Sequence, residues 1–311
     1  MFEAVANAAS GQASRSDMEA VAARLRAALG DKLTSFTAVP PEEIEAALRA
    51  VAERKPDGLI ILGGDGTARA AAEIVGRGAG VPIAPLPGGT MNVLPKKVFG
   101  ARTLDEAIDS LADHEIRPLP GGEIAGRVFF LSAALGFAGS LARLRETQRG
   151  AFRPLAFAKA WTSTANAFGS AMIQGVRWKT RKNPSWRRAH TLVLAVGSVQ
   201  SVMNPTDDED DDEGFEIASL DLRQGSDLAQ LGYHAIANSW RDAPMVLIEG
   251  ARRVDIEAPS KRPLVVLDGE PIRLPGLKSA RWIPDACMIL APKETAAQSL
   301  EKQKSEPEKT A

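Results

Sequence analysis

The stretch Leu62-Gly63-Gly64-Asp65-Gly66-Thr67 follows an apolar run, residues 57–62, and precedes an alanine-rich segment, residues 68–75. The apolar run predicts a buried parallel strand, and the alanine-rich segment predicts a helix. Glycines in the turn between them let backbone N–H groups approach an anion, and the helix start adds further N–H groups. An aspartate in such a loop fits a phosphate site when Mg²⁺ or water lies between carboxylate and phosphate. The alternative is a turn that contains glycine for steric reasons alone.

A second loop with the same organisation begins about 25 residues later along the chain. Residues 81–86 form a short apolar run, followed by Pro87-Gly88-Gly89-Thr90-Met91-Asn92 and a helical stretch that begins near Val93. Thr90 and Asn92 supply side-chain donors beside a flexible backbone. Loops at the carboxyl ends of neighbouring parallel strands lie side by side, where open α/β sheets bind ligands. We therefore expect both loops to form one nucleotide site.

The bulk composition is that of an ordinary globular protein. The chain has 311 residues, of which 44% are hydrophobic and 25% charged, and its formal net charge is -1. This length allows two domains with real cores, and the charge argues against a dedicated nucleic-acid binder. The single cysteine, Cys287, excludes an internal disulfide and is expected in the core. With no signal-peptide pattern and no apolar run of membrane-spanning length, we expect a cytoplasmic protein; contact with the inner face of the membrane and homo-oligomerisation stay open.

The order of the predicted elements changes near residue 117. Before it, strands near 3–6, 33–39, 57–62 and 81–86 alternate with helices near 17–29, 42–54, 68–75, 93 onward and 104–112. This alternation predicts an α/β domain with a doubly wound parallel sheet. After it, strands follow one another with few helices, at 128–135, 191–199, 215–222, 245–249, 254–258 and 264–267. A last apolar strand, at 286–291, could belong to either domain. These strands predict a second, mainly antiparallel, sandwich-like β domain, and the polar residues 293–311 predict a disordered tail.

Two stretches carry strongly biased charge. Residues 207–213 are seven consecutive carboxylates, which form either a solvated hairpin tip or a cation site. Residues 141–190 contain eleven Lys or Arg against one acid, together with Trp161, Trp178 and Trp186. Residues 141–173 also predict a long helix. Its basic and aromatic residues suit either contact with an anionic membrane or the core side of that helix.

The sequence resembles the bacterial diacylglycerol kinase family, which also includes sphingosine kinases. The resemblance rests on residues 63–67 (GGDGT), residues 85–92 (PLPGGTMN) and Val266-Leu267-Asp268-Gly269-Glu270. Asn7-Ala8-Ala9-Ser10-Gly11 is also similar to the family's amino-terminal turn, with Ala8 where proline is usual. The resemblance implies an ATP-binding domain, residues 1–117 with 277–292, and a lipid-binding β domain, residues 118–276.

The resemblance also implies the role of individual residues in an ATP- and Mg²⁺-dependent lipid kinase. Glu270 would be the general base for the lipid hydroxyl, and Asp65 would engage magnesium-bound water. Without the other motifs, residues 268–270 would read as a plain turn with two exposed acids. The expected nucleotide-binding residues are Gly63, Gly64, Asp65, Gly66, Thr67, Gly88, Gly89, Thr90 and Asn92, with Thr37, Asn7, Ser10 and Gly11.

The sequence departs from the family pattern at two positions. Pro120 stands where many members carry an active-site aspartate, and Glu123 lies three residues further on. Glu213 replaces the second aspartate of a structural magnesium loop, although its carboxylate can still bind Mg²⁺. Two alternatives therefore remain beside a diacylglycerol kinase: a catalytically weak lipid- or nucleotide-binding protein, and an NAD kinase. The NAD kinase is the weaker alternative, because its Thr-Pro-Thr-Gly-Ser-type stretch is absent from this sequence.

Overall fold

The computed structural model describes residues 1–10, 15–89, 92–100, 102–136, 175–197, 214–222, 241 and 243–293. The chain forms two compact units, one of Met1–Arg117 with the residues from Met288 onward, the other of Pro118–Cys287. Three predictions lie outside the described residues: the helix at 141–173, the acidic run at 207–213 and the tail from 294 onward.

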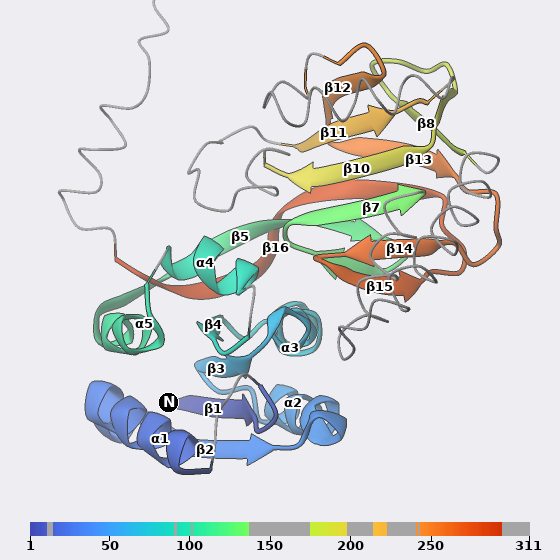
Figure 1. Cartoon of the computed structure of the whole chain (residues 1–311). Helices are drawn as coiled ribbons and strands as arrows, with labels where there is room; N and C mark the ends of the chain where they lie inside the picture. The colour runs from blue at the N-terminus through green and yellow to red at the C-terminus, as the bar shows by residue number, and fades with distance from the viewer. Residues whose placement is uncertain are drawn as a thin grey trace, which may run out of the picture. The chain divides into compact units, whose positions relative to one another are not determined.

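The first unit contains a parallel sheet with the strand order β2-β1-β3-β4-β16. Helices α1 and α5 cover one face of the sheet, and α2 and α3 cover the other (Figure 1). Short 3₁₀ turns follow α1 and α5, and another precedes α2. The bounds are β1 Phe2–Asn7, α1 Arg15–Leu29, β2 Leu33–Val39, α2 Ile44–Arg54, β3 Gly58–Gly63, α3 Asp65–Ala71, β4 Ile83–Pro87, α4 Val93–Phe99 and α5 Leu104–Ser110.

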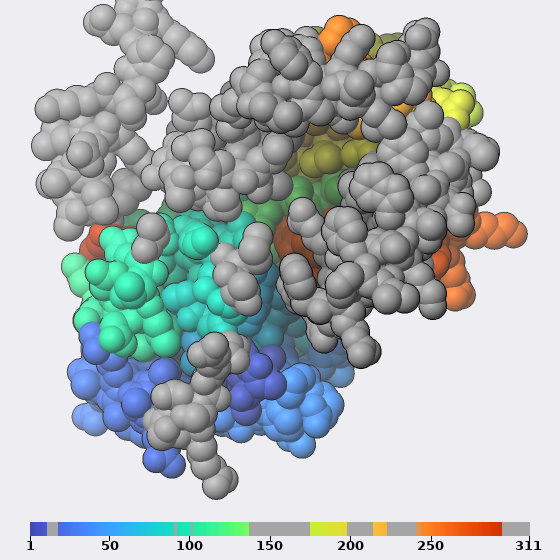
Figure 2. Space-filling model, viewed as in Figure 1, coloured from blue at the N-terminus to red at the C-terminus, as the bar shows by residue number. Residues whose placement is uncertain are grey.

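Strand β3 shows why the first unit forms this fold. Leu59, Ile60, Ile61 and Leu62 are all buried, with at most 4% of their surface exposed. Because helices cover both faces of the sheet, the strand carries an apolar run instead of an alternating pattern. Figure 2 shows the same view in space-filling form, with the described residues up to Arg117 in blue to green. The predicted doubly wound α/β fold is confirmed.

Helix α3 begins earlier than the sequence predicts. It starts at Asp65 instead of residue 68, and a π-helical turn, Ala72–Arg77, continues it. Gly64 is extended, while its carbonyl oxygen accepts the first helical hydrogen bond from the Ala68 nitrogen at 3.0 Å. Asp65 therefore belongs to the first helical turn and does not lie in a loop before it.

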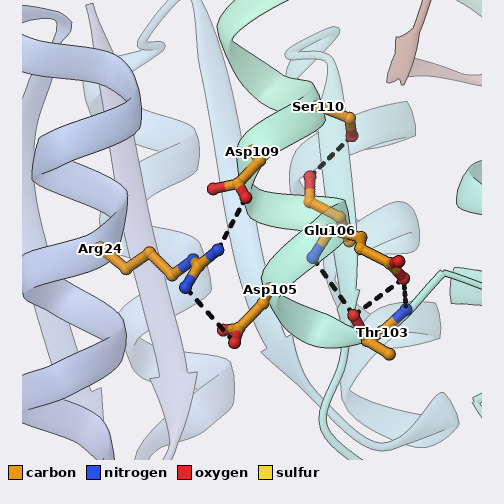
Figure 3. A network of polar contacts seen from close by, with 7 residues as sticks. Arg24, Thr103, Asp105, Glu106, Asp109 and Ser110 are labelled. Atoms are coloured by element: carbon orange, nitrogen blue, oxygen red, sulfur yellow. Dashed lines mark hydrogen bonds and ion pairs between the residues drawn. The ribbon is translucent and has the colours of Figure 1, made fainter.

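An exposed polar network joins α1 and α5 (Figure 3). Arg24 of α1 donates a 2.7 Å hydrogen bond to Asp109 and lies 3.3 Å from Asp105. Thr103 and Glu106 form a capping box that closes the start of α5. The side chains of Thr103, Asp105, Glu106 and Asp109 are exposed, so their ion pairs and hydrogen bonds add little to the stability of the unit.

The second unit contains two mainly antiparallel sheets. One has the order β12-β11-β10-β7-β14-β15; in the other, β16, β13, β8 and β9 are neighbours, and β5 pairs with β6. Residues from both sheets, including Trp178, Phe129 and Phe215, form one core, as a sandwich-like domain requires. The bounds are β5 His114–Ile124, β6 Arg127–Phe129, β7 Ser132–Gly136, β8 Val176–Thr180, β9 Arg187–Ala189, β10 Thr191–Val196, β11 Phe215–Leu220, β12 Val246–Ala251, β13 Arg253–Glu257, β14 Leu264–Leu267, β15 Glu270–Arg273 and β16 Ser279–Pro292.

Two strand predictions need correction. The predicted strand at 128–135 is broken into β6 and β7, because the backbone between them turns its N–H groups toward Asp268. The predicted terminal strand at 286–291 is the end of the much longer β16, which passes from the second unit into the first. Cys287 in β16 is buried, as predicted, and burial raises the pKa of its thiol to about 12.

The described part of the basic and tryptophan-rich segment is a β-hairpin, β8–β9. Trp178 is fully buried in the core, so it has no role at the surface. Trp186 is half-buried, with Lys179 at 4.7 Å and Arg177 at 5.3 Å from its ring centre. No helix within the described residues combines the length and apolar composition needed to cross a bilayer.

Candidate functional site

The two glycine loops of the first unit lie side by side, as predicted. Strands β3 and β4 are parallel neighbours, and the Gly88 nitrogen donates to the Gly63 carbonyl oxygen at 3.2 Å. A Cβ atom added at Gly88 would lie 2.9 Å from the Gly63 nitrogen, and one added at Gly89 would lie 2.7 Å from the Gly64 Cα. At Gly63, it would lie 2.6 Å from the Thr67 Cβ. Close packing therefore requires glycine at these three positions.

Gly64 differs from the other three glycines. Its dihedral angles, φ -78° and ψ 177°, are open to any residue. The nearest described atom to an added Cβ would be the Gly89 Cα at 4.0 Å, which is an ordinary contact distance. The steric explanation therefore accounts for Gly63, Gly88 and Gly89, but not for Gly64. A glycine here leaves a peptide surface that a ligand can approach.

The carboxylate of Asp65 joins the two loops. Its Oδ1 atom accepts hydrogen bonds from the backbone nitrogens of Val93 at 2.7 Å and Leu94 at 3.1 Å. These are the first residues of α4, whose N–H groups have no partner inside the helix. Asp65 thus caps α4 from the neighbouring strand–helix unit and holds the second loop against the first.

Two asparagines complete this arrangement. Asn92 has a left-handed backbone, φ 50°; its Oδ1 accepts from the Gly89 nitrogen at 2.6 Å, and its Nδ2 donates to the Gly89 oxygen at 2.8 Å. The amide therefore closes its own loop, and its contact with a nucleotide stays a prediction. Asn7 Nδ2 donates to Thr67 Oγ1 at 3.2 Å and so ties the end of β1 to α3. Ser10 lies in the turn after β1.

The remaining predicted nucleotide residues are not all brought to the loops. Thr37 is exposed in β2 opposite Val5, and β1 separates it from β3. Gly66 lies in the first turn of α3, whereas Gly11 and Thr90 lie outside the described residues, as does the predicted metal ligand Glu213. Sequence reasoning overlooked Arg69, which is buried in α3 and lies 3.4 Å from Glu73. The i,i+4 spacing of these two charges was the available signal.

In the second unit, Asp268 forms a tight network at the turn between β14 and β15. Asp268 and Gly269 both have positive φ, at 50° and 88°. The Asp268 carboxylate accepts three backbone hydrogen bonds, from Phe130 at 2.9 Å, Leu131 at 2.8 Å and Ser132 at 3.0 Å. The alternative of a turn with two exposed acids is therefore wrong. Asp268 binds the turn to the β6–β7 break, and half-buried Glu270 begins β15 directly after it.

The position of the expected family acid lies in β5, and compensation by Glu123 stays a prediction. Pro120 lies within β5, and Glu123 accepts from Arg281 Nη2 at 3.3 Å. Within the described part of the chain, no group of three or more His, Cys, Asp or Glu side chains is placed to hold a metal ion.

Comparison with known proteins agrees with this geometry. Residues 3–124 match the model of the diacylglycerol kinase catalytic domain, so this part of the chain is similar to a kinase domain. The fold is similar to that of a diacylglycerol kinase from Bacillus anthracis str. Sterne, with a TM-score of 0.63 and 14% identity, over 94% of this chain and 97% of that one. A second structure from this strain, described as a candidate diacylglycerol kinase, has a TM-score of 0.66 and 15% identity, with the same coverage. The predicted family resemblance is confirmed, and at these identities the structures establish the fold alone.

Proposed function

We propose that the chain is an ATP- and Mg²⁺-dependent lipid kinase that phosphorylates the hydroxyl group of diacylglycerol or a related lipid. The first unit would hold ATP, and the second unit would hold the lipid. The match to a kinase catalytic domain supports the reaction class. Nucleotide, metal and substrate are inferred from the chemistry of the residues.

The observation that carries the proposal is the glycine at position 64. Neither its backbone conformation nor its packing requires glycine. A phosphate oxygen that binds a peptide N–H must come within about 3 Å of the nitrogen, which a side chain at this point would obstruct. Gly64 therefore supports a phosphate site where β3 meets α3, beside the second loop.

Asp65 can serve both loops and metal. One carboxylate oxygen caps α4, and a carboxylate offers about four lone-pair positions in total. Mg²⁺ commonly takes only one or two carboxylates and completes its shell with phosphates and water, so the donor set fits. When bound, it would neutralise charge on the transferred phosphoryl group. Asp65 would hold a magnesium-bound water at its carboxylate.

Glu270 would act as the general base. Its carboxylate would accept the proton of the lipid hydroxyl as the oxygen attacks the γ-phosphorus of ATP and the bond from that phosphorus to the bridging oxygen breaks, releasing ADP. Asp268 positions it, because three backbone hydrogen bonds hold the turn that precedes Glu270. Proton transfer of this kind contributes roughly 10²–10⁴-fold, and positioning with electrostatic stabilisation supplies most of the remainder.

Two alternatives make different predictions. A catalytically weak lipid-binding protein is motivated by Pro120, and it predicts lipid binding without ATP turnover. Restoring an acid by Pro120→Asp should then raise activity. An NAD kinase would transfer phosphate to NAD and not to any lipid. Contact with an anionic membrane belongs to the leading proposal, and the exposed Arg177, Arg181 and Lys182 of the β8–β9 hairpin would contribute to it.

The decisive experiment measures transfer of labelled γ-phosphate from ATP to a panel of lipids in mixed micelles with Mg²⁺, with NAD as a further acceptor. We expect label in one lipid, reduced at least about a hundredfold in Glu270→Gln, which keeps the size of the side chain. Glu257→Gln, an exposed acid of the same unit, is the matched control and should retain activity. Label in NAD, or ATP binding with no labelled acceptor, would contradict the lipid kinase proposal.

A further inference from the structure

We propose that the second unit contains a binding site for a phosphate monoester, built on a basic cavity that the kinase proposal does not use. The cavity has a volume of about 250 Å³. Its lining includes Glu123, Gly126, Arg253, Lys278, Ser279 and Arg281. All of these residues belong to the second unit, so the site shares no residue with the glycine loops.

The main argument is the position of two arginines. Arg253 of β13 and Arg281 of β16 are directly opposite each other in an antiparallel pair. Their neighbours Val254 and Ala280 are fully buried in the core, so both arginines project from the outer face of the sheet. Their side chains are 64% and 58% exposed. Like charges directly opposite each other destabilise a sheet. An anion bound between the two guanidinium groups would attract both and so offset their mutual repulsion.

The acids nearby do not neutralise the cluster. Glu123 lies 3.3 Å from Arg281, and Asp255 lies 3.2 Å from Arg253. Lys278 is a third cation, and its side chain has no partner among the described residues. Three cations therefore face two carboxylates. Each guanidinium carries five donors, so its single carboxylate partner leaves several for a ligand.

The form of the cavity suits phosphate. Arginine guanidinium groups match phosphate oxygens in a bidentate manner, and the Ser279 hydroxyl can add a further donor. Tight turns at Gly126 and Gly276, with φ of 79° and 73°, form part of the rim. A Cβ atom added at either glycine would meet nothing within 4 Å, so the rim is open to an anion. Inorganic phosphate and the monoester headgroup of phosphatidic acid share this chemistry.

The first test follows thermal unfolding in inorganic phosphate and in chloride of equal ionic strength, because screening alone also changes surface electrostatics. Wild type is compared with Arg253→Gln/Arg281→Gln and with a control of equal charge change on an exposed loop, Lys261→Gln/Arg262→Gln. We expect phosphate at about ten times its Kd to raise the unfolding temperature of wild type and of the control variant. This rise should exceed that of the arginine variant by roughly 2–4 °C. Phosphate bound at the glycine loops would raise the unfolding temperature of all three proteins equally, so it does not affect the difference between them.

A second measurement separates the two sources of phosphate. Vesicles of phosphatidylcholine with phosphatidic acid are compared with vesicles in which phosphatidylglycerol, a phosphodiester, replaces phosphatidic acid. If the site binds a lipid headgroup, the arginine variant should lose at least about tenfold in affinity for the phosphatidic acid vesicles. Its affinity for the phosphatidylglycerol vesicles should not change, and neither affinity should change in the control variant. Equal vesicle binding by all proteins, with the phosphate effect on unfolding retained, assigns it to a free phosphate. The proposal is overturned if phosphate raises the unfolding temperature of the arginine variant as much as that of wild type.

Discussion

Replacing Gly64 and Gly89 separately by alanine tests whether the first glycine loop binds phosphate. At Gly64 the backbone is extended and an added methyl group would be 4.0 Å from its nearest described neighbour. Alanine there restricts the unfolded chain, so we expect Gly64→Ala to be as stable as wild type or more stable by about 0.4–1 kcal/mol. At Gly89 the methyl group would be 2.7 Å from the Gly64 Cα, so the two backbones must move apart. We expect this overpacking to cost about 1–3 kcal/mol.

Gly64→Ala should weaken ATP binding although it leaves the stability unchanged or raises it. The methyl group of Gly64→Ala would lie on the peptide surface that a phosphate must approach, so we expect ATP affinity to fall at least about tenfold, which is about 1.4 kcal/mol. Urea unfolding followed by circular dichroism gives the stability, and equilibrium binding of a fluorescent ATP analogue gives the affinity. Gly78→Ala, in the helix before β4, controls for a glycine substitution away from the loops. Wild-type ATP affinity in a stable Gly64→Ala variant would refute the phosphate site.

Four further outcomes follow from particular contacts. Asp65→Ala should lower unfolding free energy by about 2–3 kcal/mol through loss of the α4 cap, while Asp65→Asn, which keeps an acceptor oxygen, should lose about 1 kcal/mol or less; equal losses in urea unfolding would contradict the cap. Asp268→Ala leaves three backbone N–H groups without their acceptor and should cost about 2–4 kcal/mol, with the exposed Asp285→Ala as its control. Burial alone would raise the pKa of Glu249, but hydrogen bonds from Thr180, Asn183 and Arg187 outweigh burial and lower the pKa below its usual value of 4.5. The stabilisation by the Glu249 carboxylate is therefore present at neutral pH and is lost as the pH falls through the folded-state pKa. The difference in unfolding free energy between wild type and Glu249→Ala should accordingly shrink in acid. The Cys287 thiol, with its pKa raised to about 12, should resist alkylation at pH 8 in the native protein and react after unfolding in urea.

Local sequence patterns predicted much of the first unit. The apolar run before Gly63 and the glycine turn after it indicated a buried strand, and the next strand–turn–helix unit repeated the pattern. Since parallel strands end at one edge of a sheet, the meeting of the two loops followed from order alone. The start of α3 was harder to predict from the sequence, because the helix includes Asp65 to Thr67 and its first hydrogen bond is accepted by the Gly64 carbonyl oxygen.

The second unit was less predictable, because its contacts join residues far apart in the chain. The break between β6 and β7 depends on Asp268, more than 130 residues away, and an apolar run gave no sign of it. The opposition of Arg253 and Arg281 likewise exists only through the register of β13 and β16. Strand pairing has no local signature beyond alternation, so the sequence indicated strands without their partners.

The sequence by itself determined the α/β alternation, the two glycine loops and the family resemblance, since these depend on local conformation and short apolar patterns. Only the tertiary structure decided the role of each polar group, since a carboxylate or amide bonds with whichever donor the fold brings near it. It showed that Asp65 caps α4, that Asn92 closes its own loop and that Asp268 fixes the turn before Glu270. It also separated Gly64 from the glycines that packing requires, because the space around a missing Cβ is set by atoms from another strand.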